Sequence, residues 1–227
     1  MLFDIDLNRN RIFGNVEGLD TLLLKAIFQS VQDELDSERI KNINLRLKQE
    51  YGVTFQEVFN KFDKMQGVLR KFDDELKNIE DKILRNFLTV ERSTGTETWI
   101  TIRDKHLAEM ILKTYADADK KLILDLIREN AETIPKILGL CNLPNTSGYR
   151  KMNQLIEEGF VVPTGLAESF EGKRAILYKS LIQKIQISIN KDRVITSISV
   201  PKESLRSSQV INMALLINQN SMKNLTN

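Results

Sequence analysis

The chain has 227 residues, of which 41% are hydrophobic and 28% are charged, and its net charge is +2. This composition is typical of a globular protein with room for one large domain or two small ones. The charge is uneven: residues 1–119 carry 18 Lys and Arg against 22 Asp and Glu, residues 120–190 carry 10 against 7, and residues 191–227 carry 5 against 2. We therefore expect a polyanionic partner to meet the second half of the chain.

Several classes of protein are excluded by the same composition. No apolar run approaches the roughly 18 residues of a membrane-spanning helix, and the first residues lack the pattern of a signal peptide, so we expect a cytoplasmic protein without a membrane partner. The single cysteine Cys141 and the single histidine His106 leave no disulfide and no His/Cys cluster for a metal ion. Because no acid/base pair or nucleophile cluster is apparent either, we expect no enzyme, no cofactor and no metal.

Residues 1–92 predict a helical bundle with a regulatory or dimerising role. Apolar residues three and four apart indicate helices over 19–35, 40–51 and 68–90, and Gly52 is expected to end the second of them. Thr54 and Glu57 have the spacing of a capping box, which opens a further short helix. Short connections between such helices are typical of neighbours in a bundle.

Residues 93–119 are predicted to connect this bundle to the second half. A Ser/Thr/Gly-rich stretch interrupts the helical periodicity, and the sequence from Thr98 to Arg103 then indicates a short strand. An amphipathic helix is expected over 105–115. We place the domain boundary within this connector.

Residues 120–182 predict three helices followed by a β-hairpin, which is the outline of a winged helix-turn-helix domain. The helices are expected over 120–130, from Thr133 onward and over 146–158, and the hairpin has a polar tip at 168–174. Asn142 stands in the turn between the second and third helices, where a positive φ is required and asparagine is tolerated.

The outward face of the third helix carries hydroxyl, amide and guanidinium groups. Groups of these kinds bond phosphates and the base edges of the major groove. The residues on that face are Thr146, Ser147, Tyr149, Arg150, Asn153 and Gln154. The sequence therefore predicts a double-stranded DNA partner at this helix.

Residues 183–227 predict a second β-hairpin and a terminal helix. Alternating apolar residues indicate strands over 184–189 and 194–200, separated by a turn, and a last helix over 207–218. Pro201 is expected to stop the second strand. We expect this segment to contribute to dimerisation or to receive a signal.

The stretch from Thr133 to Val161 resembles the helix-turn-helix of ArsR/MarR-type winged-helix transcription regulators, particularly archaeal ones. The agreement is carried by Leu143-Pro144, Thr146-Ser147, Tyr149-Arg150-Lys151, Leu155-Ile156 and Glu158-Gly159-Phe160-Val161. The resemblance covers roughly residues 118–182. It implies that the third helix enters the major groove and that Lys173 and Arg174 of the wing approach phosphates.

Two positions depart from that pattern, and the first half has a resemblance of its own. Gly148 stands where an apolar core residue is usual and predicts looser packing of the third helix. Glu168 and Glu171 make the wing only lightly basic. The segment from Asn15 to Val90 is similar to a small helical domain of archaeal proteins, a resemblance that implies no chemistry.

Taken together, these patterns predict a mainly α fold of the α+β class, and a sequence-specific DNA-binding transcription regulator that acts as a homodimer. Lys151 is expected to hold phosphates together with the two wing cations. An effector or protein partner is expected at the bundle. The alternative is a winged-helix module that assembles with other proteins and reads no bases. The operator, the effector, the direction of regulation and the dimerising surface stay open.

Overall fold

The computed structural model describes residues 16–60, 62–65, 67, 74–91, 97–168, 174–191 and 193–223. These residues form a mixed α+β structure with antiparallel strands, which confirms the expected α+β class. The helices are α1 (Val16–Asp33), α2 (Ser37–Tyr51), α3 (Phe55–Val58), α4 (Phe62–Lys64), α6 (Asp74–Arg85), α7 (Lys105–Ala116), α8 (Ala118–Leu126), α9 (Ile134–Leu140), α10 (Asn145–Glu157), α11 (Lys202–Ser207) and α12 (Gln209–Lys223). The strands are β1 (Leu88–Val90), β2 (Glu97–Ile102), β3 (Val161–Glu168), β4 (Arg174–Ser180), β5 (Lys184–Asn190) and β6 (Arg193–Pro201).

The ends of the N-terminal helices follow from local side-chain chemistry. Asp36 accepts a hydrogen bond from the backbone N–H of Arg39 at 2.7 Å and caps α2, which ends at Gly52 with a φ of 69°. The capping box is confirmed, because the N–H of Glu57 donates to Thr54 Oγ1 and the N–H of Thr54 donates to the Glu57 carboxylate.

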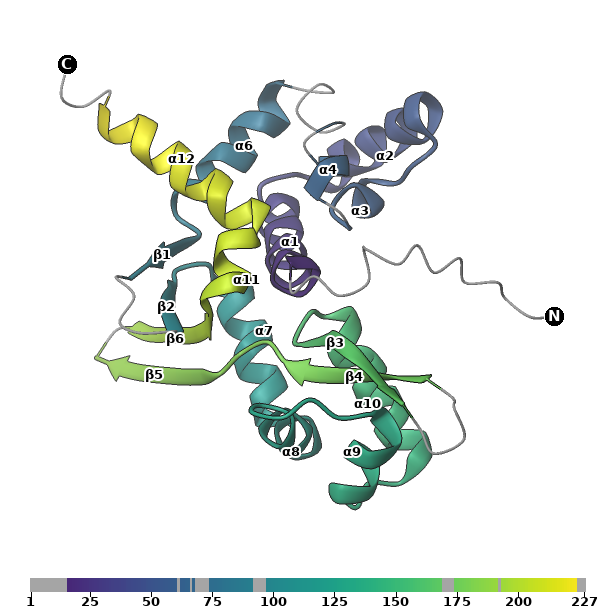
Figure 1. The fold of residues 1–227 in the computed structure, drawn as a ribbon. Helices are drawn as coiled ribbons and strands as arrows, with labels where there is room; N and C mark the ends of the chain where they lie inside the picture. The colour runs from purple at the N-terminus through teal and green to yellow at the C-terminus, as the bar shows by residue number, and fades with distance from the viewer. Residues whose placement is uncertain are drawn as a thin grey trace.

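Four strands form one antiparallel sheet in the order β1-β2-β6-β5. Strand β2 pairs with β6 along its whole length, from Glu97 opposite Pro201 to Ile102 opposite Thr196. Strand β4 of the separate β3–β4 pair leads directly into β5 (Figure 1), so that one stretch of chain connects the two sheets.

This pairing joins segments that the sequence pattern divides. The predicted connector over 93–119 contributes β2, and the predicted C-terminal segment over 183–227 contributes β5 and β6 to the same sheet. Alternating apolar residues identify each strand by itself but do not identify its partner. Only the folded chain shows that the two segments share one layer.

The predicted helix over 68–90 is wrong at its C-terminal end. Helix α6 ends at Arg85, and residues 88–90 form β1, in which Leu88 lies opposite Ile102 of β2. The carbonyl of Phe87 accepts the N–H groups of both residues that follow β2, at 3.0 Å each. A backbone ladder with β2 therefore replaces the last helical turn that the apolar spacing suggested.

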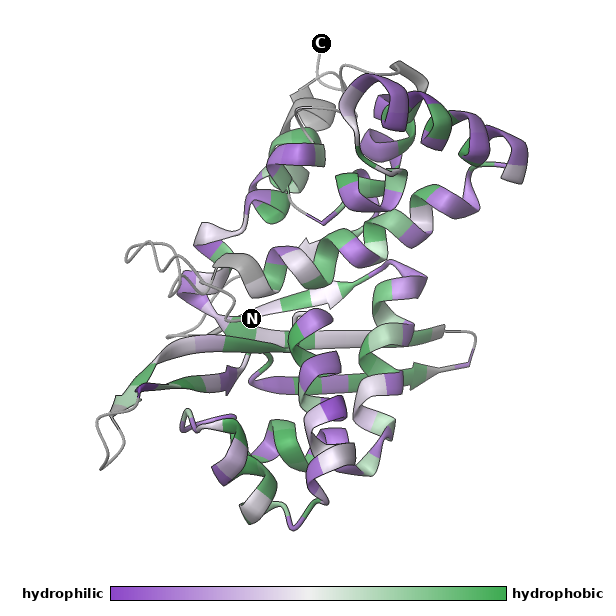
Figure 2. Ribbon diagram, turned by 90° about the vertical axis from the view of Figure 1, so that its right-hand side faces the viewer, coloured by the Kyte–Doolittle hydropathy of each residue, from purple (hydrophilic) through white to green (hydrophobic). Residues whose placement is uncertain are grey.

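Helix α1 lies in the middle of the molecule (Figure 1), with α2, α3, α6 and α12 toward one end and α8, α9 and α10 at the other. It contacts α6, α7, α11, α12 and β3. Figure 2 shows hydrophobic and hydrophilic residues interleaved along the helices around it. Because α1 is packed from several sides, its apolar residues are buried around most of its circumference. They are Leu19, Leu22, Leu23, Leu24, Ala26, Ile27 and Val31.

A buried carboxylate connects α1 to the C-terminal helix. Asp20 accepts hydrogen bonds from the Ser208 hydroxyl and from the backbone N–H groups of Gln209, at 3.0 Å, and Val210, at 3.3 Å. These are the first amides of α12, so Asp20 caps that helix from a distant part of the chain. Burial raises the pKa of Asp20 above its ordinary value, although the hydrogen bonds oppose this shift.

Two glycines allow α1 to touch the turn after α10. A Cβ at Gly18 would lie 2.0 Å from a methyl group of Val162, and a Cβ at Gly159 would lie 2.4 Å from the carbonyl oxygen of Gly18. Gly159 has a φ of 82°, a conformation that side chains other than glycine rarely adopt. The two halves of the chain therefore meet through backbone contact at this crossing.

We expect Gly159→Ala to lower the free energy of unfolding by about 2–4 kcal/mol, because the new methyl group meets fixed backbone and the φ is unfavourable. Gly139→Ala, in open space on α9, should change stability by no more than about 1 kcal/mol, in the stabilising direction. Urea denaturation of both variants measures the difference. Equal stabilities would contradict the close crossing.

Candidate nucleic-acid interface

Helices α8, α9 and α10 and the β3–β4 pair follow one another at one end of the molecule (Figure 1). Helix α10 packs on α8 and α9 through Met152 and Leu155, which are fully buried. Ile137 and Leu138 of α9 are buried with them. The inward face of α10 is thereby fixed, and the residues between these apolar positions must face outward.

The turn between α9 and α10 has the conformation that the sequence predicts. Asn142 has a φ of 51° and is the one non-glycine residue with a positive φ in the part of the chain described. The N–H of Leu143 donates to the carbonyl of Leu138 at 3.0 Å, and its side chain packs against the core. Asparagine tolerates this left-handed conformation better than most residues, which explains the tight turn.

Gly148 tightens the packing of α10 and does not loosen it, contrary to the expectation from the sequence. Its backbone is buried, and a Cβ at this position would lie 2.6 Å from Cδ2 of Leu138. The Leu138 side chain therefore occupies the space that a side chain at 148 would need. The apolar contact that is usual here comes from α9 instead of α10.

The outward face of α10 is open to solvent. Tyr149 is 41% exposed. Of the other residues predicted to meet DNA, Ser147 is half-buried and its hydroxyl donates to the carbonyl of Pro144 at 3.2 Å. Gln154 donates from Nε2 to Oε1 of Glu158 at 2.9 Å. The exposed members of the predicted set are Thr146, Tyr149, Arg150, Asn153 and Gln154.

Arg150 is the free cation on this face. Its guanidinium forms no ion pair or hydrogen bond with any other residue that the structure describes. No side chain caps the first turn of α10, whose preceding residue is Pro144. The first amides of α10 and the Arg150 guanidinium are therefore both available to an anion.

Lys151 does not share this face. Its ammonium lies 2.6 Å and 2.7 Å from the carboxylate oxygens of Asp117 and 3.3 Å from Asp119, and its side chain is 15% exposed. The Lys151 ammonium holds the pKa of Asp117 below its ordinary value, and the two carboxylates raise the pKa of Lys151. Asp117 also caps α8, so the pair fixes α10 against α8, whereas the sequence pattern suggested a phosphate contact.

The β3–β4 pair extends beside this helix with few described cations. Arg174 is exposed and lies opposite Glu168 in the register, whereas Lys173 and the rest of the predicted tip lie outside the described residues. Leu166 and Ile176 lie opposite each other and are 43% and 39% exposed. The described part of this hairpin therefore exposes an apolar pair, Leu166 and Ile176, beside the exposed cation Arg174.

One contact at the base of this hairpin is not evident from the sequence. The backbone of Glu132, between α8 and α9, pairs with Tyr178 of β4 through two hydrogen bonds of 3.0 Å and 2.9 Å. The Glu132 carboxylate also accepts from Lys136 at 2.6 Å. The hairpin is thus attached to the helices by backbone pairing, and no local pattern indicates a single isolated bridge.

Neither a metal centre nor a membrane span occurs among the described residues. No three His, Cys, Asp or Glu side chains there are arranged to hold a metal ion. No described helix combines the length and the apolar character needed to cross a bilayer. Cys141 is buried, and burial raises the pKa of its thiol, which disfavours the reactive thiolate.

We expect Lys151→Met to raise the pKa of Asp117 toward 3.8, its ordinary value, and to lower the free energy of unfolding at pH 7 by about 1 kcal/mol. Because the pKa of Asp117 is lowered in the folded state, the ion pair stabilises at neutral pH and loses its effect as the pH falls below 3.8. The difference in the free energy of unfolding between the wild type and Lys151→Met should therefore become smaller in acid. NMR titration and denaturation measure both effects, with Lys113→Met on α7 as the control.

No protein-family model, curated protein or solved structure matches this chain. The polar outward face of α10 exposes hydrogen-bonding side chains, with Arg150, a cation unpaired among the described residues, near its centre.

Proposed function

We propose that this protein binds double-stranded DNA through a winged helix-turn-helix formed by α8, α9, α10 and the β3–β4 hairpin. The observation that carries the proposal is the open polar face of α10, a helix whose opposite face is fixed in the core. A helix of this kind, preceded by a tight turn, fits the major groove. The resemblance of the same residues to ArsR/MarR-type regulators supports this assignment.

The side chains on α10 suit both base reading and backbone contact. Arg150 can donate two hydrogen bonds to a guanine, and the amides of Asn153 and Gln154 match the edge of an adenine. Thr146, in the uncapped first turn of the helix, would meet a phosphate. Arg174 of the wing would add a second phosphate contact.

The small number of free cations on this surface, counted over its described residues, favours binding as a homodimer. The ammonium of Lys151 is engaged by two aspartates and that of Lys136 by Glu132. Fewer phosphate contacts mean weaker binding by one copy, and two copies on adjacent half-sites double the number. We therefore propose a homodimeric transcription regulator acting in the cytoplasm.

We expect Arg150→Ala to weaken binding to selected DNA by about 5- to 150-fold, because one bidentate base contact contributes about 1–3 kcal/mol. The full chain first selects sites from a pool of randomised duplexes, and fluorescence anisotropy then measures the affinity at several salt concentrations. Binding should saturate and should weaken as salt rises. Arg46→Ala, an exposed arginine on α2 that pairs with Glu50, is the control and should bind as the wild type does. Binding that never saturates, or an Arg150→Ala variant with wild-type affinity, would reject the proposal.

A second candidate function is assembly with another protein, which the exposed apolar pair Leu166 and Ile176 on the hairpin favours. Under this reading the double variant Leu166→Ser, Ile176→Ser loses a stoichiometric partner on purification from source cells and keeps its affinity for DNA. Under the DNA-binding proposal alone, the double variant purifies as the wild type does. Quantitative mass spectrometry of the purified samples distinguishes the two.

A further inference from the structure

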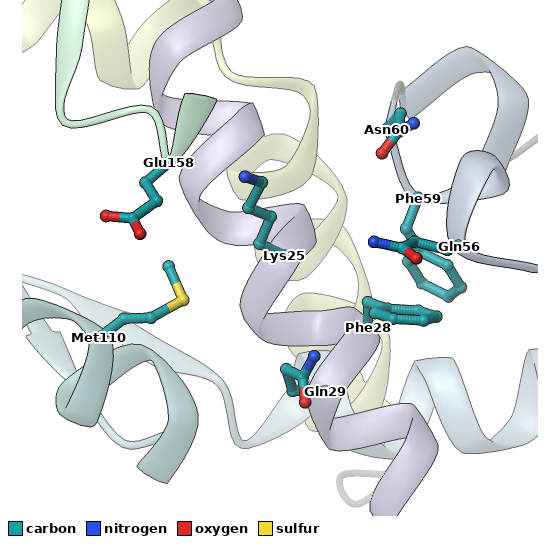
Figure 3. A pocket seen from close by; sticks show the side chains of 8 residues that line it. All are labelled: Lys25, Phe28, Gln29, Gln56, Phe59, Asn60, Met110 and Glu158. Atoms are coloured by element: carbon teal, nitrogen blue, oxygen red, sulfur yellow. The ribbon is translucent and has the colours of Figure 1, made fainter. Parts of the chain in front are cut away.

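A cavity of about 230 Å³ lies where the N-terminal helices meet the end of α10. Figure 3 shows its lining: Lys25 and Phe28 project from α1, Phe59 follows α3, Met110 comes from α7, and Glu158 directly follows α10. Its volume equals that of about eight water molecules. A site of this size, below the roughly 300–1,000 Å³ of sites for drug-sized ligands, suits a small molecule.

The uncompensated charge in this cavity is positive. The Lys25 ammonium forms no ion pair or hydrogen bond with any other residue in the described ranges. The carboxylate of Glu158 is already engaged, since one oxygen accepts from Gln154 at 2.9 Å and the other from Lys120 at 3.4 Å. A ligand that neutralises the cavity therefore carries a negative charge.

Part of the lining is apolar. The rings of Phe28 and Phe59 pack with their centroids 5.3 Å apart, and the Met110 thioether faces the cavity from the other side (Figure 3). Two side-chain amides, those of Gln56 and Asn60, also line the cavity (Figure 3). Apolar side chains, one free cation and two amides in one lining together match a ligand with an apolar body and one charged oxygen-bearing group.

We propose that this cavity binds a small amphipathic carboxylate, with the carboxylate on Lys25 and the apolar body against Phe28 and Phe59. The binding site does not depend on the DNA-binding proposal. The cavity also touches α10, because Glu158 accepts the hydrogen bond of Gln154 on the outward face. Resting on the proposed function, this contact gives the ligand a route to alter DNA affinity through Gln154.

The direct test is equilibrium dialysis of the full chain with labelled phenylacetate, without DNA. We expect saturable binding of phenylacetate, and binding at least about tenfold weaker for phenylacetamide, which has the same apolar body and a neutral head. Lys25→Met should lose the preference for the anion, and Lys25→Arg should retain it. Lys41→Met, on the exposed side of α2, is the matched control and should bind as the wild type does.

The proposal is overturned if phenylacetate does not bind saturably, if phenylacetamide binds equally well, or if Lys25→Met keeps wild-type affinity. The link to α10 has a separate test, in which phenylacetate changes the DNA affinity of the wild type and not of Lys25→Met. An unchanged DNA affinity in the presence of bound phenylacetate rejects the link. Absence of DNA binding rejects the proposed function and leaves the dialysis result standing.

Discussion

The close crossing of α1 over the turn after α10 is the contact through which the two halves of the molecule constrain each other. At this crossing the backbone of Gly18 meets the backbone of Gly159, and neither position has space for a side chain. At Gly159 the two nearest atoms, the carbonyl oxygen of Gly18 and the amide nitrogen of Leu22, belong to the backbone and cannot relax by a change of rotamer. The orientation of α10 is therefore determined by α8 and α9, which pack on its buried face, and by α1, which contacts the turn at its C-terminal end.

Helix α1 contacts three parts of the structure along its length. Gly18, in its first turn, contacts the turn after α10. Asp20 caps the distant helix α12, and Lys25 lines the cavity. A helix buried from several sides is rigid, since each apolar contact restricts the others. A ligand beside Lys25 would thus lie on an element that already joins the N-terminal helices, the C-terminal helix and the proposed DNA-binding end.

On α10 itself, two adjacent basic residues have different environments. Arg150 projects into solvent, whereas the ammonium of Lys151 is held by two aspartates at the start of α8. One residue along a helix corresponds to a rotation of about 100°, which is enough to move a side chain from the open face to the packed one. The different environments of Arg150 and Lys151 thus follow from helical geometry and from the position of α8.

Local chemistry made many features of this fold predictable. The capping box at Thr54, the stop at Gly52, the positive φ of Asn142 and the strand at β2 each depend on residues within a few positions of one another. The outward face of α10 followed from apolar spacing alone. That the residues on this face of α10 contact DNA stays a prediction.

Periodicity and capping act over a few residues, which is why most helices and strands and the polar face of α10 could be predicted from the residue pattern. Three features could not be predicted in this way: the pairing of β2 with β6, the filling of the space at Gly148 by Leu138, and the ion pair between Asp117 and Lys151. Each of these depends on which elements the folded chain brings together, and the periodicity of one element does not identify the element that packs against it. The cavity beside Lys25 belongs to the same group, because its walls come from four separate segments.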